Sequence, residues 1–350
     1  MQNARGTIDY NNDEWNIMSN IINTIKKRVK TLNVDFIDTP ILENTELLLK
    51  KYGDEAETKL IYDLKDGTSL RYDLTVPLVR YFCNNGLESM RRFQVGKVFR
   101  KDNPEVEKGR FREFYQADLD IVGTYEPLVS EIEIFWLINR VLTDLEISDY
   151  VIKYNYRENL YDMCKKIGIS NDKHVKSICI SIDKLDKFTW EQVEEELIKI
   201  RKLSQIQCNE LKELIEKNYL SENLIENDAK LNKYSENLER DTSLARGLDY
   251  YTGIIYEVKI LSSDKTIIAG GRYDKMIYKS LKNGKKYLPA IGVSFGVSRI
   301  SFFSKKSNEE NNKILIISNN FDIRMKLLEF FRDKGFIVNY DNLNRKVIKQ

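Results

Sequence analysis

The first clear pattern in the chain is an apolar position at every third or fourth residue near the N-terminus. The apolar positions are Trp15, Met18, Ile22, Ile25, Val29 and Leu32. This spacing places them on one face of a helix, so it predicts an amphipathic α-helix over residues 15–32. A similar pattern predicts a second helix over about 131–145.

Between these helices the pattern changes to an alternation of apolar and polar residues, which is typical of strands. The alternating segments lie around residues 59–64, 68–76, 91–100 and 111–122. Their connections are too short for the crossovers that parallel strands need, so the pattern predicts an antiparallel sheet. Short charged helical patterns replace the strands over about 159–240, and strand patterns return at 253–260 and 266–271. The sheet domain is therefore predicted to contain a helical insertion.

The last part of the chain has a different order of elements. Residues 314–317 form an apolar run, a helical pattern follows near 322–334, and a second apolar run covers 336–340. Strand, helix and strand are only the opening of an α/β domain. The sequence thus predicts an α+β fold with four parts, which are the first part of the sheet domain (1–165), a helical insertion domain (166–238), the second part of the sheet domain (239–305) and a partial α/β C-terminal domain (306–350).

Three of the predicted strands carry an unusual polar face, and one of them, over 94–100, has Gln94, Gly96, Val98 and Arg100 on one side. Near 70–75, Arg71, Asp73 and Thr75 alternate with apolar residues. Around 111–121 one side shows Tyr115, Ala117, Leu119 and Ile121, and the other shows Arg112, Phe114, Gln116, Asp118 and Asp120. Such a face is either solvated, as is common in antiparallel sheets, or it lines a pocket. The mixture of guanidinium, amide, carboxylate and aromatic groups suits a pocket for an ammonium, a phosphate and a flat ring.

Composition and charge restrict the chemistry further. The chain has 350 residues, of which 42% are hydrophobic and 31% charged, as expected for a folded globular protein. Its formal charge of +2 gives no overall attraction to DNA or to an anionic membrane. A single histidine, His174, and four cysteines without a Cys-x-x-Cys pair nearly exclude a protein-bound zinc site. Chemistry must therefore depend on carboxylates, arginines, hydroxyls and the substrate itself.

The same features bear on location. The N-terminus is polar, no segment approaches the roughly 20 apolar residues of a membrane span, and the cysteines are scattered. We therefore expect a cytoplasmic protein with no membrane partner.

Several motifs together resemble a known family. Residues 92–100 and 109–116, separated by a long polar hairpin loop, resemble motif 2 of the class II aminoacyl-tRNA synthetases. Residues 244–253 and 269–274 resemble the two signatures of histidyl-tRNA synthetases, and 290–300 resembles motif 3. Residues 6–10 and 37–40 resemble the start of the family and motif 1, whereas 72–77 and 181–187 resemble its eukaryotic cytosolic branch.

The resemblance implies a class II antiparallel sheet flanked by helices and a role for each of several side chains. Histidine would be bound by Asp73, Leu74, Thr75, Gln116, Asp120, Tyr250 and Tyr251. ATP would be bound by Arg100, Arg110, Phe114 and Arg299, with Arg100 and Arg246 catalytic at the α-phosphate. Taken alone, Arg246 and Arg299 would more commonly be ordinary ion-pair residues.

The implied activity is histidine–tRNA ligation. Histidine and ATP would give histidyl-adenylate and pyrophosphate, and tRNA(His) would accept the histidine. Mg²⁺ would accompany the ATP phosphates, without a protein cluster of histidine or cysteine ligands. The resemblance also implies a homodimer with motif 1 at the contact.

Two other functions remain open at this point. One is a synthetase-like regulatory or histidine-sensing paralogue that does not charge tRNA, and the other is an enzyme that passes the adenylate to another acceptor. The partial C-terminal domain favours the first of these alternatives, because family members end in an anticodon-binding α/β domain. The complete set of arginines and the Tyr250–Tyr251 pair favour the ligase. A smaller departure is Ser298, which stands where motif 3 usually has glutamate.

Overall fold

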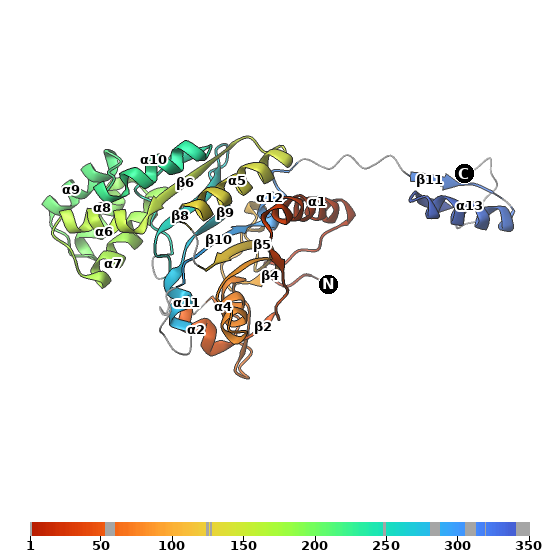
Figure 1. Cartoon of the computed structure of the whole chain (residues 1–350), viewed down its shortest axis with the longest axis horizontal. Helices are drawn as coiled ribbons and strands as arrows, with labels where there is room; N and C mark the ends of the chain where they lie inside the picture. Colours follow the sequence, from red (N-terminus) through yellow and green to blue (C-terminus); the bar gives the residue numbers. More distant parts are fainter. Residues whose placement is uncertain are drawn as a thin grey trace. The chain divides into compact units, whose positions relative to one another are not determined.

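The structure is a computed structural model that describes residues 2–52, 60–123, 126, 128–247, 250–280, 288–304, 313–318 and 320–340. The chain divides into two compact units, residues 1–305 and 306–350. Figure 1 shows the first unit as a central sheet flanked by helices.

Among the described residues the central sheet has eight strands, and its middle is antiparallel as predicted. In spatial order the strands are β1 (Asp35–Phe36), β4 (Met90–Phe99), β5 (Glu113–Val122), β10 (Ala290–Phe295), β9 (Lys265–Arg272), β8 (Ile254–Ile260), β6 (Tyr150–Tyr156) and β7 (Leu238–Arg240). The two edge strands were not among the predicted segments, and they pair in parallel, β1 with β4 and β7 with β6. In each case a long stretch of chain with helices separates the two strands, which is the connection that parallel pairing requires.

One face of the sheet is covered by helices and forms the main core. The first predicted helix is confirmed as α1 (Asn12–Val29), continued by η1 (Lys30–Leu32), and the second as α5 (Val129–Asp144). α1 and α5 contact each other and the sheet. α1 begins at a capping box, in which Asn11 Oδ1 accepts the Glu14 N–H at 3.0 Å and Glu14 Oε2 accepts the Asn11 N–H at 2.8 Å.

The sequence pattern of β5 explains this core. Ala117, Leu119 and Ile121 are buried against the helices, so the predicted apolar side of this strand is confirmed. The alternate residues of β5 face the opposite side of the sheet, where the polar face lies.

The region before β4 differs from the prediction. β2 (Leu42–Asn44) and β3 (Thr68–Leu70) form a small antiparallel pair, and the helices there are α2 (Thr45–Tyr52) and α4 (Thr75–Asn84). The strand expected over 68–76 therefore ends at Leu70. Asp73 causes the change, since its Oδ1 accepts the N–H groups of Thr75 and Val76 at 3.1 and 3.0 Å, in the manner of a helix cap. Of the strand expected over 59–64, residues 60–64 contribute an isolated bridge at Asp63.

The helical pattern over 159–240 is confirmed by a group of short helices beside β6 and β8 (Figure 1). They are α6 (Arg157–Lys166), α7 (Asp172–Ile182), η3 (Asp183–Asp186), α8 (Trp190–Lys199), α9 (Gln205–Glu216), η4 (Glu222–Leu224) and α10 (Ile225–Tyr234). The buried side chains of α6, α7, α8 and α9 form one cluster with Ala245 and Ile255, whereas Leu224 of η4 and Leu231 of α10 belong to the main core, so the helical segment packs onto the sheet. Its status as a separate insertion domain stays a prediction.

Three further short helices lie among the described residues of the first unit, namely η2 (Val106–Lys108) in the hairpin loop between β4 and β5, α11 (Asp274–Ser280) and α12 (Val297–Ile300). In the second unit the predicted strand, helix and strand are confirmed as β11 (Lys313–Ile316), α13 (Phe321–Asp333) and β12 (Ile337–Tyr340). β11 and β12 pair in parallel over a small cluster of Ile316, Leu328 and Val338.

Candidate active site

A cavity of about 680 Å³ opens on the polar face of the sheet. Eleven of the predicted site residues line it, namely Asp73, Thr75, Arg100, Arg110, Phe114, Gln116, Asp120, Arg246, Tyr250, Tyr251 and Arg299. Leu74 is not among the lining residues. Its side chain is fully buried, and its carbonyl oxygen accepts a hydrogen bond from Arg92 Nη2 at 2.9 Å.

The Asp120 carboxylate on β5 is a buried polar group of the cavity. Strand register places Arg92 opposite Asp120 on one side and Gly292 on the other. Arg92 Nη2 lies 2.6 Å from Asp120 Oδ2, and the Tyr273 hydroxyl donates to Asp120 Oδ1. Gly292 is needed beside it, because a β-carbon there would overlap Asp120 Oδ1. The carboxylate is therefore fixed in direction.

Asp118, two residues earlier on β5, is a second buried carboxylate and was not among the predicted ligands. Its Oδ1 has no hydrogen-bond partner within the described part of the chain. Burial raises the pKa of Asp118 to about 7, an effect that Arg92 opposes and Asp120 reinforces. Its place on the polar side of β5, between Gln116 and Asp120, was the sequence signal for it. Gln116 donates to Ser294 Oγ at 2.8 Å, and this serine lies opposite Asp118.

Asp118 should make stability depend on pH. The folded protein keeps a proton on this group between about pH 4 and about pH 7, where the unfolded chain has lost it, so the free energy of unfolding falls as pH rises through this window. We expect Asp118→Asn to remove this part of the dependence. Urea denaturation at a series of pH values measures it, and an equal pH dependence in the variant and the wild type would contradict the assignment.

Two adjacent tyrosines form one wall of the cavity. Gly247 has φ of +64°, which suits glycine, and its carbonyl oxygen accepts the N–H groups of Tyr250 and Tyr251 at 3.1 and 2.8 Å. The ring centroids are 4.2 Å apart. Gly271 on β9 makes room for this wall, because a β-carbon there would lie 2.7 Å from the Tyr251 ring.

Four arginines gather along another part of the cavity. Arg100 follows β4, Arg110 lies in the hairpin loop and Arg299 lies in α12. Burial lowers the pKa of Arg299, and repulsion from Arg100, Arg110 and Arg246 lowers it further. Positive charges held this close together are suited to a polyanion such as a triphosphate.

Aromatic rings hold Arg100 within this group. Its guanidinium carbon lies 4.3 Å from the centre of the Tyr72 ring and 5.2 Å from that of Phe114. Its Nε donates to the Tyr72 carbonyl oxygen at 3.2 Å. Arg299 is held differently, since its Nη1 donates to the Thr266 carbonyl oxygen at 2.9 Å.

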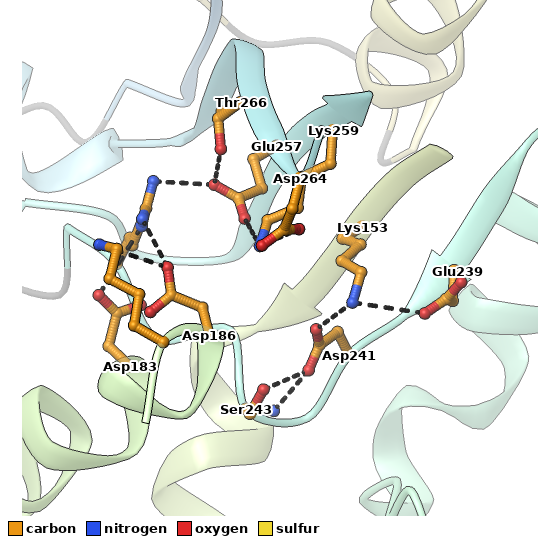
Figure 2. A network of polar contacts seen from close by, with 12 residues as sticks. Lys153, Asp183, Asp186, Glu239, Asp241, Ser243, Glu257, Lys259, Asp264 and Thr266 are labelled. Carbon is orange, nitrogen blue, oxygen red and sulfur yellow. Dashed lines mark hydrogen bonds and ion pairs between the residues drawn. The ribbon is translucent and has the colours of Figure 1, made fainter. Parts of the chain in front are cut away.

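Carboxylates surround Arg246, the fourth arginine. Its Nη1 donates to Glu257 Oε2 at 2.9 Å, and its Nη2 donates to Asp186 Oδ2 at 3.3 Å. Its Nε lies 3.7 Å from Asp183 Oδ2. Burial alone would lower the pKa of Arg246, but these three carboxylates raise it overall. Figure 2 shows Glu257, Asp183 and Asp186 within one polar network.

The N-terminal residues reach the site through Ser298, the departure from motif 3. Its Oγ accepts the N–H of Tyr115 at 3.0 Å and lies 3.1 Å from the Tyr10 hydroxyl. Ser298 thereby joins α12, which carries Arg299, to β5 and to the segment before α1.

Within the described residues, no group of three or more histidine, cysteine, aspartate or glutamate side chains is arranged to hold a metal ion. In the same part of the chain, no helix is both long and apolar enough to span a membrane.

Comparisons with known proteins agree with the fold. A family model described as histidyl-tRNA synthetase matches residues 6–300. A cytoplasmic histidine–tRNA ligase of Dictyostelium discoideum is 36% identical and covers 90% of this chain, which spans 71% of that protein. A mitochondrial histidine–tRNA ligase of Saccharomyces cerevisiae is also 36% identical, over 86% of this chain and 65% of its own length. The solved structure of a histidyl-tRNA synthetase from Nostoc sp. PCC 7120 superposes with a TM-score of 0.79 at 21% identity, covering 100% of this chain and 88% of that one.

A mostly antiparallel sheet with helices on one face and arginines and carboxylates on the other defines a class II aminoacyl-tRNA synthetase fold. The predicted α+β class is thereby confirmed. The chain belongs to the histidyl-tRNA synthetase family. The predicted enzyme class, a ligase that forms aminoacyl-tRNA, is supported by the named relatives, and a histidine-sensing paralogue is not favoured.

Proposed function

We propose that the cavity activates histidine with ATP to histidyl-adenylate and then transfers the histidine to tRNA(His). The observation that supports this most strongly is the division of charge within one cavity. Buried carboxylates lie at one part and four arginines at another. Histidine has an ammonium and an imidazole for the acidic part, and ATP has phosphates for the arginines.

In the first step a carboxylate oxygen of histidine attacks the α-phosphorus of ATP. The new bond joins that oxygen to phosphorus, and the bond to the β-phosphate oxygen breaks, so that pyrophosphate leaves. Arg100 and Arg246 would neutralise the charge that develops on the α-phosphoryl oxygens. Arg110 and Arg299 would hold the outer phosphates, and Phe114 would stack on adenine. No protein nucleophile is needed, because the two substrates are held in line.

Recognition of histidine would use the other part of the cavity. Asp73, Thr75 and Gln116 would bind the α-ammonium, and Asp120 would accept a hydrogen bond from the imidazole. Asp73 has a second task, since its Oδ1 accepts N–H groups at the start of α4. Tyr250 and Tyr251 would enclose the imidazole. These roles rest on the positions of the side chains around the cavity.

Mg²⁺ would bind to the β- and γ-phosphates of ATP, which supply the oxygen ligands that this ion prefers. In the second step a ribose hydroxyl of tRNA(His) would attack the acyl carbon of the adenylate and release AMP. The proposed function requires neither DNA nor a membrane.

We further propose a cytoplasmic homodimer with the motif 1 region at its contact. Phe36, Ile41 and Leu42 are 46%, 44% and 52% exposed on neighbouring segments of this region, and the short edge strand β1 lies there. Exposed apolar side chains beside a sheet edge are typical of an interface. Sedimentation analysis is expected to give twice the mass of the chain, and a monomer at micromolar concentration would contradict the dimer. The relatives include both cytoplasmic and mitochondrial enzymes, so localisation of a tagged protein in cells is the corresponding test.

Histidine-dependent exchange of pyrophosphate into ATP is the direct test of the proposed first step. We expect exchange that requires histidine and is not supported by other amino acids, because Asp120 is fixed in direction by Arg92 and Tyr273. Lack of exchange by folded protein would contradict the proposal. Exchange without charging of tRNA(His) would show that the adenylate passes to another acceptor.

A further inference from the structure

The helical segment brings two carboxylates to the candidate active site. Asp183 and Asp186 lie in η3, which connects α7 to the turn before α8. Asp186 and the neighbouring Lys187 line the cavity, and Lys187 Nζ lies 3.6 Å from Asp186 Oδ2. These residues belong to the segment 181–187 that the sequence singled out and that the proposed roles do not yet use.

Each nitrogen of the Arg246 guanidinium has its own carboxylate partner. Nε is 3.7 Å from Asp183, Nη2 is 3.3 Å from Asp186, and Nη1 is 2.9 Å from Glu257. The partners come from two different parts of the fold, because Glu257 lies on β8 and the two aspartates lie in the helical segment (Figure 2). Contacts on all three nitrogens fix both the position and the plane of a guanidinium.

Glu257 provides the rigid side of this arrangement. It is only 3% exposed, and its Oε2 also accepts the Thr266 hydroxyl at 2.9 Å. Lys259 Nζ lies 3.5 Å from Glu257 Oε1 and 3.2 Å from Asp264 Oδ1. The strand thus fixes one end of the guanidinium, whereas η3 determines how the other two nitrogens lie.

The backbone before Arg246 is tied to the same turn. Asp183 Oδ1 accepts the N–H of Ala245, the residue preceding Arg246, at 3.4 Å. Asp183 therefore contacts both the side chain and the preceding backbone of this segment. Arginine has five N–H donors, and the two hydrogen bonds to Glu257 and Asp186 use one on Nη1 and one on Nη2. Each of these nitrogens has a second hydrogen that can point to a phosphate oxygen.

We infer that Asp183 and Asp186 are positioning residues for Arg246, through which the helical segment sets the rate of histidine activation. This inference rests on the proposed function, since Arg246 acts there on the α-phosphate. Removing the two carboxylates would leave Arg246 attached to Glu257 alone, free to rotate about that contact. The neighbouring cation Arg299, whose charge repels that of Arg246, would then favour its displacement.

The test uses the full chain with Asp183→Asn, Asp186→Asn and the double variant. Initial rates of histidine-dependent pyrophosphate exchange give kcat and KM. Displacement of a catalytic group by about 1 Å lowers the reaction rate by up to about 100-fold. We therefore expect kcat of the double variant to fall by about 10-fold to 100-fold. The KM for histidine should change by less than about 2-fold. Asp186→Glu should recover part of the loss that Asp186→Asn causes.

Glu195→Gln is the matched control. It makes the same change of charge in the same helical segment, but Glu195 is exposed and pairs with Lys199. We expect wild-type kcat for this variant and an unchanged midpoint of thermal unfolding for all variants. If the double variant does not fold, Asp186→Asn alone decides, because Asp186 is not the aspartate that accepts the Ala245 N–H.

The outcomes are separable. The inference would be overturned, and the proposed function left intact, if the folded double variant had the kcat of the wild type. If the double variant does not fold, the same result in folded Asp186→Asn would overturn it. If kcat falls only in variants whose midpoint of thermal unfolding is also lowered, the aspartates have a merely structural role. That result would also overturn the inference. No exchange by the wild type would contradict the proposed function itself.

Discussion

Arg246→Ala is expected to reduce the rate of histidine-dependent pyrophosphate exchange by about 100-fold to 1000-fold. Reductions of this size are typical when one group that stabilises a transition-state charge is removed. The reason is that the proposed α-phosphate position loses a guanidinium that three carboxylates hold in a fixed plane. Exchange rates at saturating histidine and ATP measure the effect.

The fold should survive this change. Glu257, although buried, keeps the Thr266 hydroxyl and Lys259 as partners. Circular dichroism and thermal unfolding check that the variant is folded. Arg246→Lys is the informative companion, because it keeps the charge but loses the planar set of donors, and we expect activity between those of alanine and arginine. Wild-type exchange by folded Arg246→Ala would show that the assigned role is wrong.

The largest effect on stability is expected from Arg92→Ala. Arg92 is fully buried, lies 2.6 Å from Asp120 and also donates to the Leu74 carbonyl oxygen. Removing one member of a buried ion pair leaves the other charge uncompensated, so the free energy of unfolding should fall by about 3–5 kcal/mol. Urea denaturation at constant pH measures the change.

Arg28→Ala provides the comparison for this experiment. Arg28 forms a pair with Asp144, but both side chains are partly exposed, at 30% and 25%. Such pairs contribute about 1 kcal/mol or less. If Arg92→Ala also lowers the free energy of unfolding by less than about 1 kcal/mol, Asp120 is neutral or otherwise compensated in the folded protein. That result would contradict the geometry described above.

Sequence alone was sufficient where one local pattern determined the outcome. The three-to-four-residue spacing placed α1, and the alternation in β5 separated Leu119 from Asp120 correctly. The alternation failed after Leu70, because Asp73 can cap a helix, and this local hydrogen bonding outweighs the strand pattern.

Partners across the sheet were beyond the sequence patterns. Arg92 meets Asp120 only because β4 and β5 pair in one particular register, and a shift by one residue would turn Arg92 to the other face. Glu257 on β8 contacts Arg246, which precedes this strand in the chain. No periodicity in the sequence indicates this contact. The fold class and eleven of the residues that line the cavity were therefore predictable, whereas Arg92 and Glu257, which hold two of these side chains in place, were not.

The two faces of β5 have a consequence for changing the substrate of this protein. Ala117, Leu119 and Ile121 anchor the strand in the main core, and Gln116, Asp118 and Asp120 line the cavity from the same backbone. A repacked core would shift the strand and with it every polar group on its other side. Laboratory selection for activity with a new amino acid and selection for thermal stability would therefore act on the same ten residues of β5. A gain in one property should regularly require compensation in the other.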